Sequence, residues 1–203
     1  MSWEDGEPLI IDAGPTLTFT AAGQRELLMD VVTRRGSRLL MPESVIDEVA
    51  RKSSQQKRFA ECENDLANVI AHGQIEKLRD DIEDVALSQQ VNRITGLGTR
   101  VRLGESKDLG ETMVIAHALK LKQSGAEARV FIDEWRGQRV ALRHGLKVVS
   151  TESILVGAIS LKLVSDRGEM RKIYDKLREF DDGLVHIDQT QLLSRERYRR
   201  ARS

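Results

Sequence analysis

Short apolar runs alternate with longer segments of helical periodicity along this chain, and the alternation is the strongest constraint on its fold. The runs cover residues 9–11, 38–41, 130–132 and 147–149. Short apolar strands separated by helices are typical of a parallel sheet that is covered on both faces. The helices are expected at residues 21–35, 42–52, 55–71, 81–95, 108–122, 134–144 and 152–163. The sequence therefore predicts a three-layer α/β/α fold with a central, mainly parallel sheet.

The length of 203 residues suits a single domain, 1–203, with a substantial core. No Pro-rich or Ser-rich linker divides the chain. Beyond Asp166 the pattern is helical through Phe180, turns at residues 181–183 and then predicts another helix. We therefore expect a core at about 8–163 and a helical C-terminal extension at about 164–203.

Two of the predicted strands are followed directly by an aspartate. Asp12 follows the run 9–11 and precedes a Gly-Pro pair at 14–15, which predicts a turn. Asp133 follows the run 130–132. Open α/β folds bind ligands at the carboxyl edge of the sheet, so both carboxylates are expected there.

Two further acids lie beside the apolar stripes of predicted helices. Glu48 stands three residues after Val45, and Glu111 shares a helical face with Ile115 and Ala118. An acid on an apolar face needs a partner. Carboxylates gathered in one cleft repel each other unless a cation lies between them, so the four acids predict a hard divalent cation and metal-assisted phosphodiester chemistry.

Each acid also has an ordinary structural interpretation. Asp12 alone could be a turn or capping residue, and Glu48 alone could be a solvated helix residue. Asp108 and Glu111 match a capping box, in which the two residues satisfy each other's backbone N–H groups. Asp47 and Glu134 are interpreted as bystanders. Only the joint pattern favours a site.

Taken in order, these segments resemble the PIN-domain family. They are LIIDAGPTL at 9–17, MPESVIDEV at 41–49, LGETMVIAHA at 109–118, VFIDEWRGQRVA at 130–141 and GLKVVST at 145–151. The resemblance runs from roughly Pro8 to Leu163. The helical remainder is similar to the C-terminal extension of the longer, VapC-related bacterial PIN proteins.

The resemblance implies a metal-dependent nuclease, usually acting on RNA, that leaves a 5′-phosphate and a 3′-hydroxyl. It places Asp12, Glu48, Glu111 and Asp133 at the catalytic and metal-binding acids, with Mg²⁺ or Mn²⁺ as cofactor. Thr151 matches a Ser or Thr that often helps to hold the attacking water. The chain departs from the pattern at Ser153, where many members have a further acid.

Signatures of other catalytic classes are absent from the sequence. The four histidines are scattered and do not form an H-x-x-x-H zinc spacing. Gly96 and Gly98 begin like a dinucleotide fingerprint, but Val101 breaks it, which favours a flexible loop. Neither a Walker A sequence nor a G-x-S-x-G elbow occurs.

Charge and cysteine content favour a soluble protein of the cytoplasm. The 32 basic and 32 acidic residues balance, which argues against a general nucleic-acid-coating protein. One cysteine, Cys62, excludes an internal disulfide framework, and neither a signal peptide nor a membrane span is evident. Arginines flank the 96–98 loop and crowd the C-terminus, where they either contact nucleic acid or a partner, or form a solvated helix end: Arg93, Arg100, Arg102, Arg195, Arg197, Arg199, Arg200 and Arg202.

The function predicted from these observations is a divalent-metal-dependent endoribonuclease, with the toxin of a type II toxin–antitoxin pair as one role. Two alternatives stay open: a housekeeping RNA-processing or DNA-directed nuclease, and a noncatalytic nucleic-acid-binding protein that retains the fold. The candidate partners are an RNA substrate, a cognate antitoxin protein and a second copy of the chain in a homodimer. A membrane partner is not expected.

Overall fold

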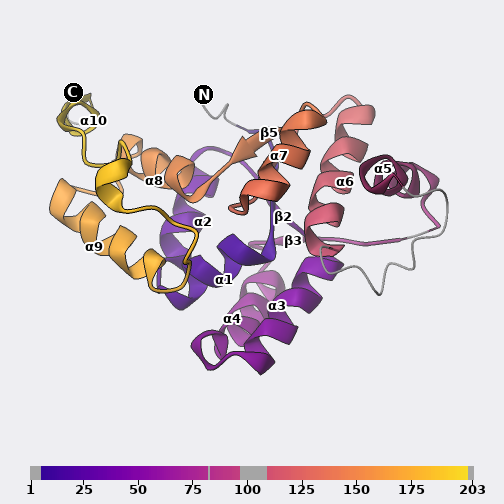
Figure 1. Cartoon of the computed structure of the whole chain (residues 1–203), viewed down its shortest axis with the longest axis horizontal. Coiled ribbons are helices and arrows are strands. Elements are labelled where there is room, and N and C mark those ends of the chain that lie inside the picture. Colours follow the sequence, from indigo (N-terminus) through magenta and orange to yellow (C-terminus); the bar gives the residue numbers. More distant parts are fainter. Residues whose placement is uncertain (1–5, 82, 97–108, 201–203) are drawn as a thin grey trace.

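The computed structural model describes residues 6–81, 83–96 and 109–200 (Figure 1). Within them, five parallel strands form one sheet with the order β3-β2-β1-β4-β5. The strands are β1 (Leu9–Ile11), β2 (Leu39–Pro42), β3 (Glu76–Leu78), β4 (Arg129–Phe131) and β5 (Lys147–Val149). The expectation of a parallel sheet in a three-layer α/β/α fold is confirmed.

Helices connect the strands and continue beyond the last of them. Figure 1 shows α2 and α8 on one side of the sheet and α5 and α6 on the other. The helices are α1 (Ala13–Ala21), α2 (Arg25–Arg34), α3 (Glu43–Gln55), α4 (Cys62–Ala71), α5 (Val85–Thr95), α6 (Leu109–Gln123), α7 (Trp135–Arg143), α8 (Thr151–Ser160), α9 (Arg167–Arg178) and α10 (Arg195–Arg200), with short 3₁₀ turns η1 (Lys57–Phe59) and η2 (Ile187–Gln189).

The edge strand β3 is one element that the sequence did not predict. Its residues Glu76–Leu78 are exposed or only partly buried, whereas every residue of β1 and β2 is buried. An edge strand pairs through its backbone on one side only, so it needs no apolar run. The hydrophobic pattern therefore carried no signal for it.

The Gly-Pro pair after Asp12 lies in a helix, so the predicted turn at this point is wrong. Helix α1 begins at Ala13, and Pro15 falls in its first turn, where the missing N–H of proline costs no helical hydrogen bond. The predicted helix 21–35 is the end of α1 followed by α2. The two are separated at Gly23, whose φ of +67° ends the first helix.

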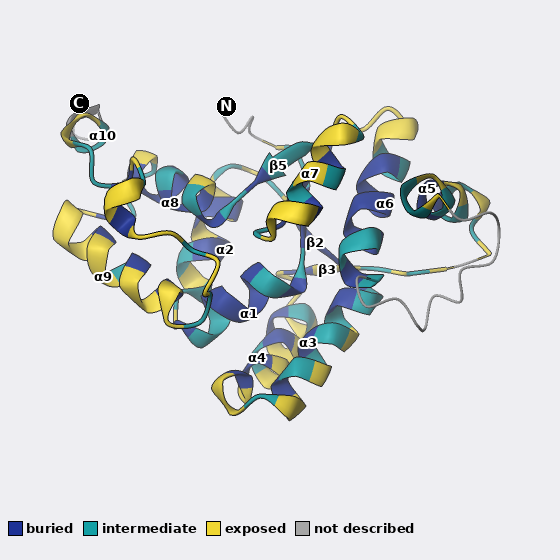
Figure 2. Ribbon diagram, viewed as in Figure 1, coloured by how far each residue is buried: buried dark blue, intermediate teal, exposed yellow. Residues whose placement is uncertain are grey.

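The core spans the sheet, its covering helices and the C-terminal extension. Figure 2 shows the buried residues gathered on the strands and along much of α6, which packs against β1, β2 and β4. Met170, Tyr174 and Leu177 of α9 belong to the same hydrophobic cluster as the central strands. The extension therefore packs onto the domain and carries its own loop toward the sheet. Over the described residues, none of the helices combines the length and apolarity that crossing a membrane requires.

Candidate active site

The reversal of strand order puts the two strand-end aspartates side by side. β1 pairs with β2 on one edge and with β4 on the other, and Ile11 is in register with Phe131. The backbone N–H of Asp12 donates to the carbonyl of Phe131 at 3.0 Å. Asp12 thus leaves β1, and Asp133 leaves β4, at the position where such sheets open a crevice for ligands.

Helices α3 and α6 bring the two glutamates to the same place. A Cβ atom added at Gly110 of α6 would lie 2.7 Å from Oε2 of Glu48 and 3.7 Å from Oδ1 of Asp12. A Cβ atom at Gly137 of α7 would overlap the carboxylate of Glu111 and lie 2.8 Å from Cγ2 of Ile132. The two glycines therefore make room for the acid side chains between the packed helices.

Asp12, Glu48, Glu111 and Asp133 line one pocket of about 500 Å³. They come from the ends of two strands and from two helices that are far apart in the sequence. The sequence predicted that these four acids meet, and the fold brings them together. No single one of them would have indicated a site.

Burial makes the charged forms of Asp12 and Asp133 unfavourable. Burial raises the pKa of Asp12 to about 6, opposed by the backbone N–H of Ala13 and reinforced by the charge of Glu48. Glu48 itself forms an ion pair with Lys52, one helical turn further along α3, with 2.7 Å between Oε1 and Nζ. The pocket therefore holds more negative charge than its own side chains neutralise, which favours an added cation.

Thr151 acts on Asp133 from behind the pocket. Its backbone N–H, at the start of α8, donates to Oδ1 of Asp133 at 2.9 Å, and its hydroxyl donates to Oδ2 at 2.6 Å. Thr151 is fully buried. Burial raises the pKa of Asp133 to about 6, these two hydrogen bonds oppose the rise, and Asp181 and Asp12 reinforce it. The hydroxyl proton of Thr151 is thus given to Asp133, and the expectation that Thr151 helps to hold the attacking water stays a prediction.

Acids from four elements on one pocket, at the point where the strand order reverses, match the arrangement that the sequence segments implied. A family model of the PIN domain matches residues 8–189. The chain belongs to the PIN-domain family. PIN domains are generally nucleases and generally use divalent metal ions. No curated protein matches the chain.

The family match extends past the predicted limit of residue 163 and includes α9 and the turn after it. That turn contributes Asp181 and Asp182 to the pocket. The sequence showed the pair only as a turn, since nothing in its spacing linked it to the strand ends. In this PIN domain, acids of the extension thus add to the negative charge of the pocket.

Lys52 and Arg58 are the basic residues that line the pocket within the described chain. The predicted arginines lie elsewhere or outside the described residues. Arg93 acts electrostatically on His144, and Arg197 donates to the carbonyl of Gln191 at 2.9 Å. The structure does not describe Arg100, Arg102, Arg202, the Asp108 half of the capping box or most of the 96–98 loop. Glu134 lines the pocket, whereas Asp47 is not among the lining residues, and the interpretation of both as bystanders stays a prediction.

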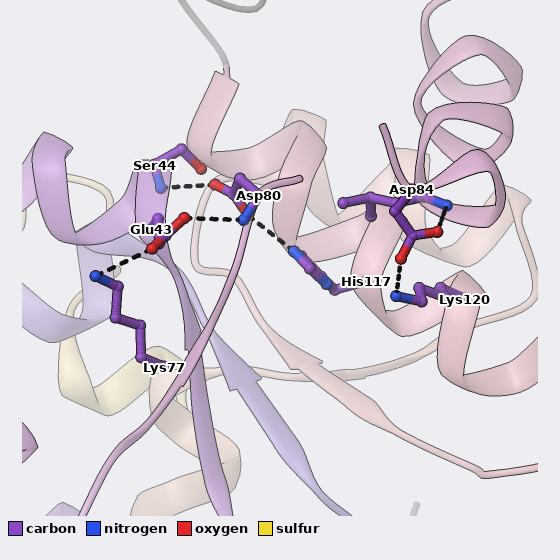
Figure 3. Close-up of polar contacts among 8 residues, drawn as sticks. Glu43, Ser44, Lys77, Asp80, Asp84, His117 and Lys120 are labelled. Carbon is purple, nitrogen blue, oxygen red and sulfur yellow. Dashed lines mark hydrogen bonds and ion pairs between the residues drawn. The ribbon is translucent and has the colours of Figure 1, made fainter. Parts of the chain in front are cut away.

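A separate hydrogen-bond network fixes the two helices that carry the glutamates (Figure 3). Oδ2 of Asp80 accepts from the backbone N–H of Ser44 at the start of α3 at 2.7 Å, and Oδ1 accepts from Nε2 of His117 on α6 at 2.8 Å. Glu43 accepts from the backbone N–H of Asp80 at 3.1 Å and pairs with Lys77 at 3.0 Å. Asp80 therefore ties α3 to α6.

The pocket residues fit a divalent cation by their chemistry. Every candidate ligand is a carboxylate, and Mg²⁺ and Mn²⁺ prefer oxygen ligands. Burial raises the pKa of Asp12 and Asp133, so their charged forms are costly without an added cation. Among the side chains that the structure describes, no three His, Cys, Asp or Glu residues already form a closed ligand cluster. The four acids line the pocket without converging on one point.

Proposed function

We propose that this PIN domain is a divalent-metal-dependent endoribonuclease that hydrolyses RNA phosphodiester bonds. The observation that carries the proposal is that four carboxylates from four separate elements line one pocket at the carboxyl edge of the sheet. The family resemblance supports RNA as the substrate. A role as the toxin of a type II toxin–antitoxin pair belongs to the same proposal.

Asp12, Glu48, Glu111 and Asp133 would hold Mg²⁺ or Mn²⁺. When bound, such an ion supplies Lewis-acid polarisation of the phosphate and lowers the pKa of the attacking water. The chain's own residues orient these ligands. Thr151 fixes both oxygens of Asp133, and Lys52 holds one oxygen of Glu48. Hydrolysis by water leaves a 5′-phosphate and a 3′-hydroxyl and needs no protein nucleophile.

Cleavage of a labelled, structured RNA in Mn²⁺, with an EDTA blank, tests the proposal. Replacing Asp12 or Asp133 by Asn, or Glu48 or Glu111 by Gln, keeps the side-chain shape and removes its charge. Each change should lower cleavage roughly 100-fold or more, because even residues that only support metal ligands contribute 10–100-fold. Circular dichroism verifies that each variant is folded.

Asp47→Asn is the matched control, since Asp47 lies on α3 beside Glu48 but outside the pocket lining. It should retain near wild-type cleavage. A labelled single-stranded DNA of the same sequence decides between RNA and DNA. If the wild type binds RNA without cutting it under any divalent ion, or if Asp47→Asn loses as much activity as Asp12→Asn, the proposed site is wrong.

The toxin role has its own experiment. Expression of the wild-type chain alone in a bacterial host should arrest growth and deplete defined RNAs, and Asp12→Asn should relieve both effects at the same protein level. Normal growth with abundant soluble wild-type protein would assign the nuclease to a housekeeping role instead.

A further inference from the structure

Trp135 is an exposed aromatic residue at the wall of the carboxylate pocket. It is the first residue of α7, two positions after Asp133, and its side chain lines the pocket while the residue is 67% exposed. Helix α7 buries its opposite side through Gly137 and Ala141. Trp135 therefore contributes little to the core and borders the pocket in which substrate would lie.

The other aromatic residues of the pocket differ from Trp135. Phe59 is 5% exposed and packs against Phe180, with 6.3 Å between the ring centroids. Arg58 lies over the Phe59 ring at 4.6 Å. These two rings are satisfied within the protein. Cζ of Arg139 lies 5.8 Å from the centroid of the Trp135 ring, and most of the surface of Trp135 stays accessible.

The surroundings of Trp135 suit a nucleotide better than an apolar partner. Lys52 and Arg58 supply positive charge to the same pocket, which complements phosphate groups. The strand-end and helix acids would face a phosphate through a cation. An aromatic ring beside basic groups is the combination that binds single strands, because every base has a face that stacks and every linkage carries a charge.

We propose that Trp135 stacks on an unpaired base of the substrate and so sets which nucleotide faces the carboxylates. The proposal rests on the nuclease function stated above. It adds a residue that positions the substrate and the requirement that the bound segment be unpaired. Since Trp135 follows Asp133 by two residues, the stacked base belongs to the nucleotide at or beside the scissile phosphate. A base inside a duplex is already stacked on its neighbours, so the segment that enters must be single-stranded or a loop.

A double-mutant cycle between protein and substrate tests this stacking. A short labelled RNA is bound in EDTA, which arrests cleavage, and affinity is measured by fluorescence polarisation. The cycle compares wild type with Trp135→Ala, on the intact RNA and on RNAs with one abasic site moved along the strand. Trp135→Ala should weaken binding of intact RNA about 5- to 100-fold, and Trp135→Phe should restore most of the loss.

At one abasic position, Trp135→Ala should weaken binding no further than the missing base already does. The base and the ring are the two halves of one contact, so their losses of affinity do not multiply. Leu142→Ala is the matched control, as Leu142 lies on the same helix, is 56% exposed and does not line the pocket. Arg58→Ala should weaken intact and abasic strands alike and reduce the salt dependence of binding by about 0.7 in the logarithmic slope.

The outcomes separate this proposal from the nuclease function. If Trp135→Ala binds intact RNA as wild type does, or if its loss is the same at every abasic position, the stacking proposal is overturned even where cleavage is observed. Equal affinity for a duplex of the same sequence would also overturn it. Conversely, a coupled base and ring without cleavage in any divalent ion would leave the stacking contact standing and remove the nuclease function.

Discussion

Asp80 and Asp12 are both partly buried carboxylates, and the fold treats them in opposite ways. Burial works against the charge of Asp80, but hydrogen bonds from His117 and Ser44 outweigh it and lower the pKa. At Asp12, burial raises the pKa to about 6, and the neighbouring Glu48 adds to the rise. Asp80 accepts hydrogen bonds from neighbouring groups of the protein. Asp12 shares its pocket with further acids.

The difference separates a carboxylate whose charge the protein stabilises from a carboxylate whose charge it leaves costly. Asp80 joins the start of α3 to α6, so its charge is stabilised where it positions two helices. The pocket acids lie on or just after elements that the sheet and Asp80 already hold in place. Their mutual repulsion lowers stability in the absence of a cation, which is a common trade between stability and activity.

The largest effect on stability is expected from breaking the Asp80 network. Asp80→Ala leaves the N–H of Ser44 and the ring of His117 without their acceptor, so the free energy of unfolding should fall by about 2–4 kcal/mol. Asp12→Asn should instead raise it in metal-free buffer by up to about 3 kcal/mol, because it removes a charge whose pKa is raised from 3.8 to about 6. Urea denaturation in EDTA measures both.

The opposite signs are the informative result. Asp47→Asn is the control, with little change expected at a residue outside both the pocket and the network. If Asp12→Asn destabilised the protein as much as Asp80→Ala does, the pocket acids would be structural groups and the contrast between the two regions would not hold.

The next effect concerns cation binding. Mn²⁺ or Mg²⁺ at 100 times its dissociation constant should stabilise the native state by about 2.7 kcal/mol, since the ion binds the gathered acids and not the unfolded chain. For a chain of this size the melting temperature should rise by about 5–10 °C. Asp133→Asn should abolish this rise. Asp80→Ala should show the same rise, but from a lower melting temperature without metal. Thermal melts without any metal-dependent shift, together with no heat of binding in calorimetry, would contradict the metal site.

The pH dependence of stability should also differ in sign between the regions. Asp12 and Asp133 bind protons more tightly in the folded protein than in the unfolded chain. Their contribution to stability is therefore complete below pH 3.8 and is lost as pH rises through about 6. The contribution of Asp80 is present above 3.8 and is lost as pH falls below that value. In metal-free buffer, the free energy of unfolding should therefore decline less between pH 4 and pH 7 in Asp12→Asn and Asp133→Asn than in the wild type. An unchanged profile in both variants would overturn this assignment.

The smallest effect is expected at Thr151. Its hydroxyl donates a hydrogen bond to the carboxylate of Asp133, as the ring of His117 does to the carboxylate of Asp80. Thr151→Val removes the hydroxyl that donates to Oδ2 and keeps the side-chain volume, so the pKa of Asp133 should rise further. Metal affinity should fall about 10-fold, as for other residues that orient a ligand. Titration of the melting temperature with Mn²⁺ measures it. A variant with unchanged affinity would show that the backbone N–H of Thr151 suffices.

Much of this molecule could be predicted from local patterns. The runs at 9–11 and 147–149 became strands at the same residues, because short runs rich in β-branched apolar residues between helical segments favour the strands of a covered sheet. The edge strand β3 and the start of α1 escaped prediction. β3 has no apolar run, and the Gly-Pro pair after Asp12 carries a turn signal that helix packing overrides.

The sequence by itself determined four of the five strands that the structure describes, two acids that follow strands and two that lie on helices, since hydrophobic period and strand-end position are local properties. Only the tertiary structure decided which other groups share the pocket. Asp181 arrives on a turn that follows α9, Lys52 and Arg58 arrive from α3 and η1, and Trp135 stays exposed beside Asp133. Such neighbours depend on how distant elements pack, and packing brings together residues whose spacing along the chain carries no information about their contact.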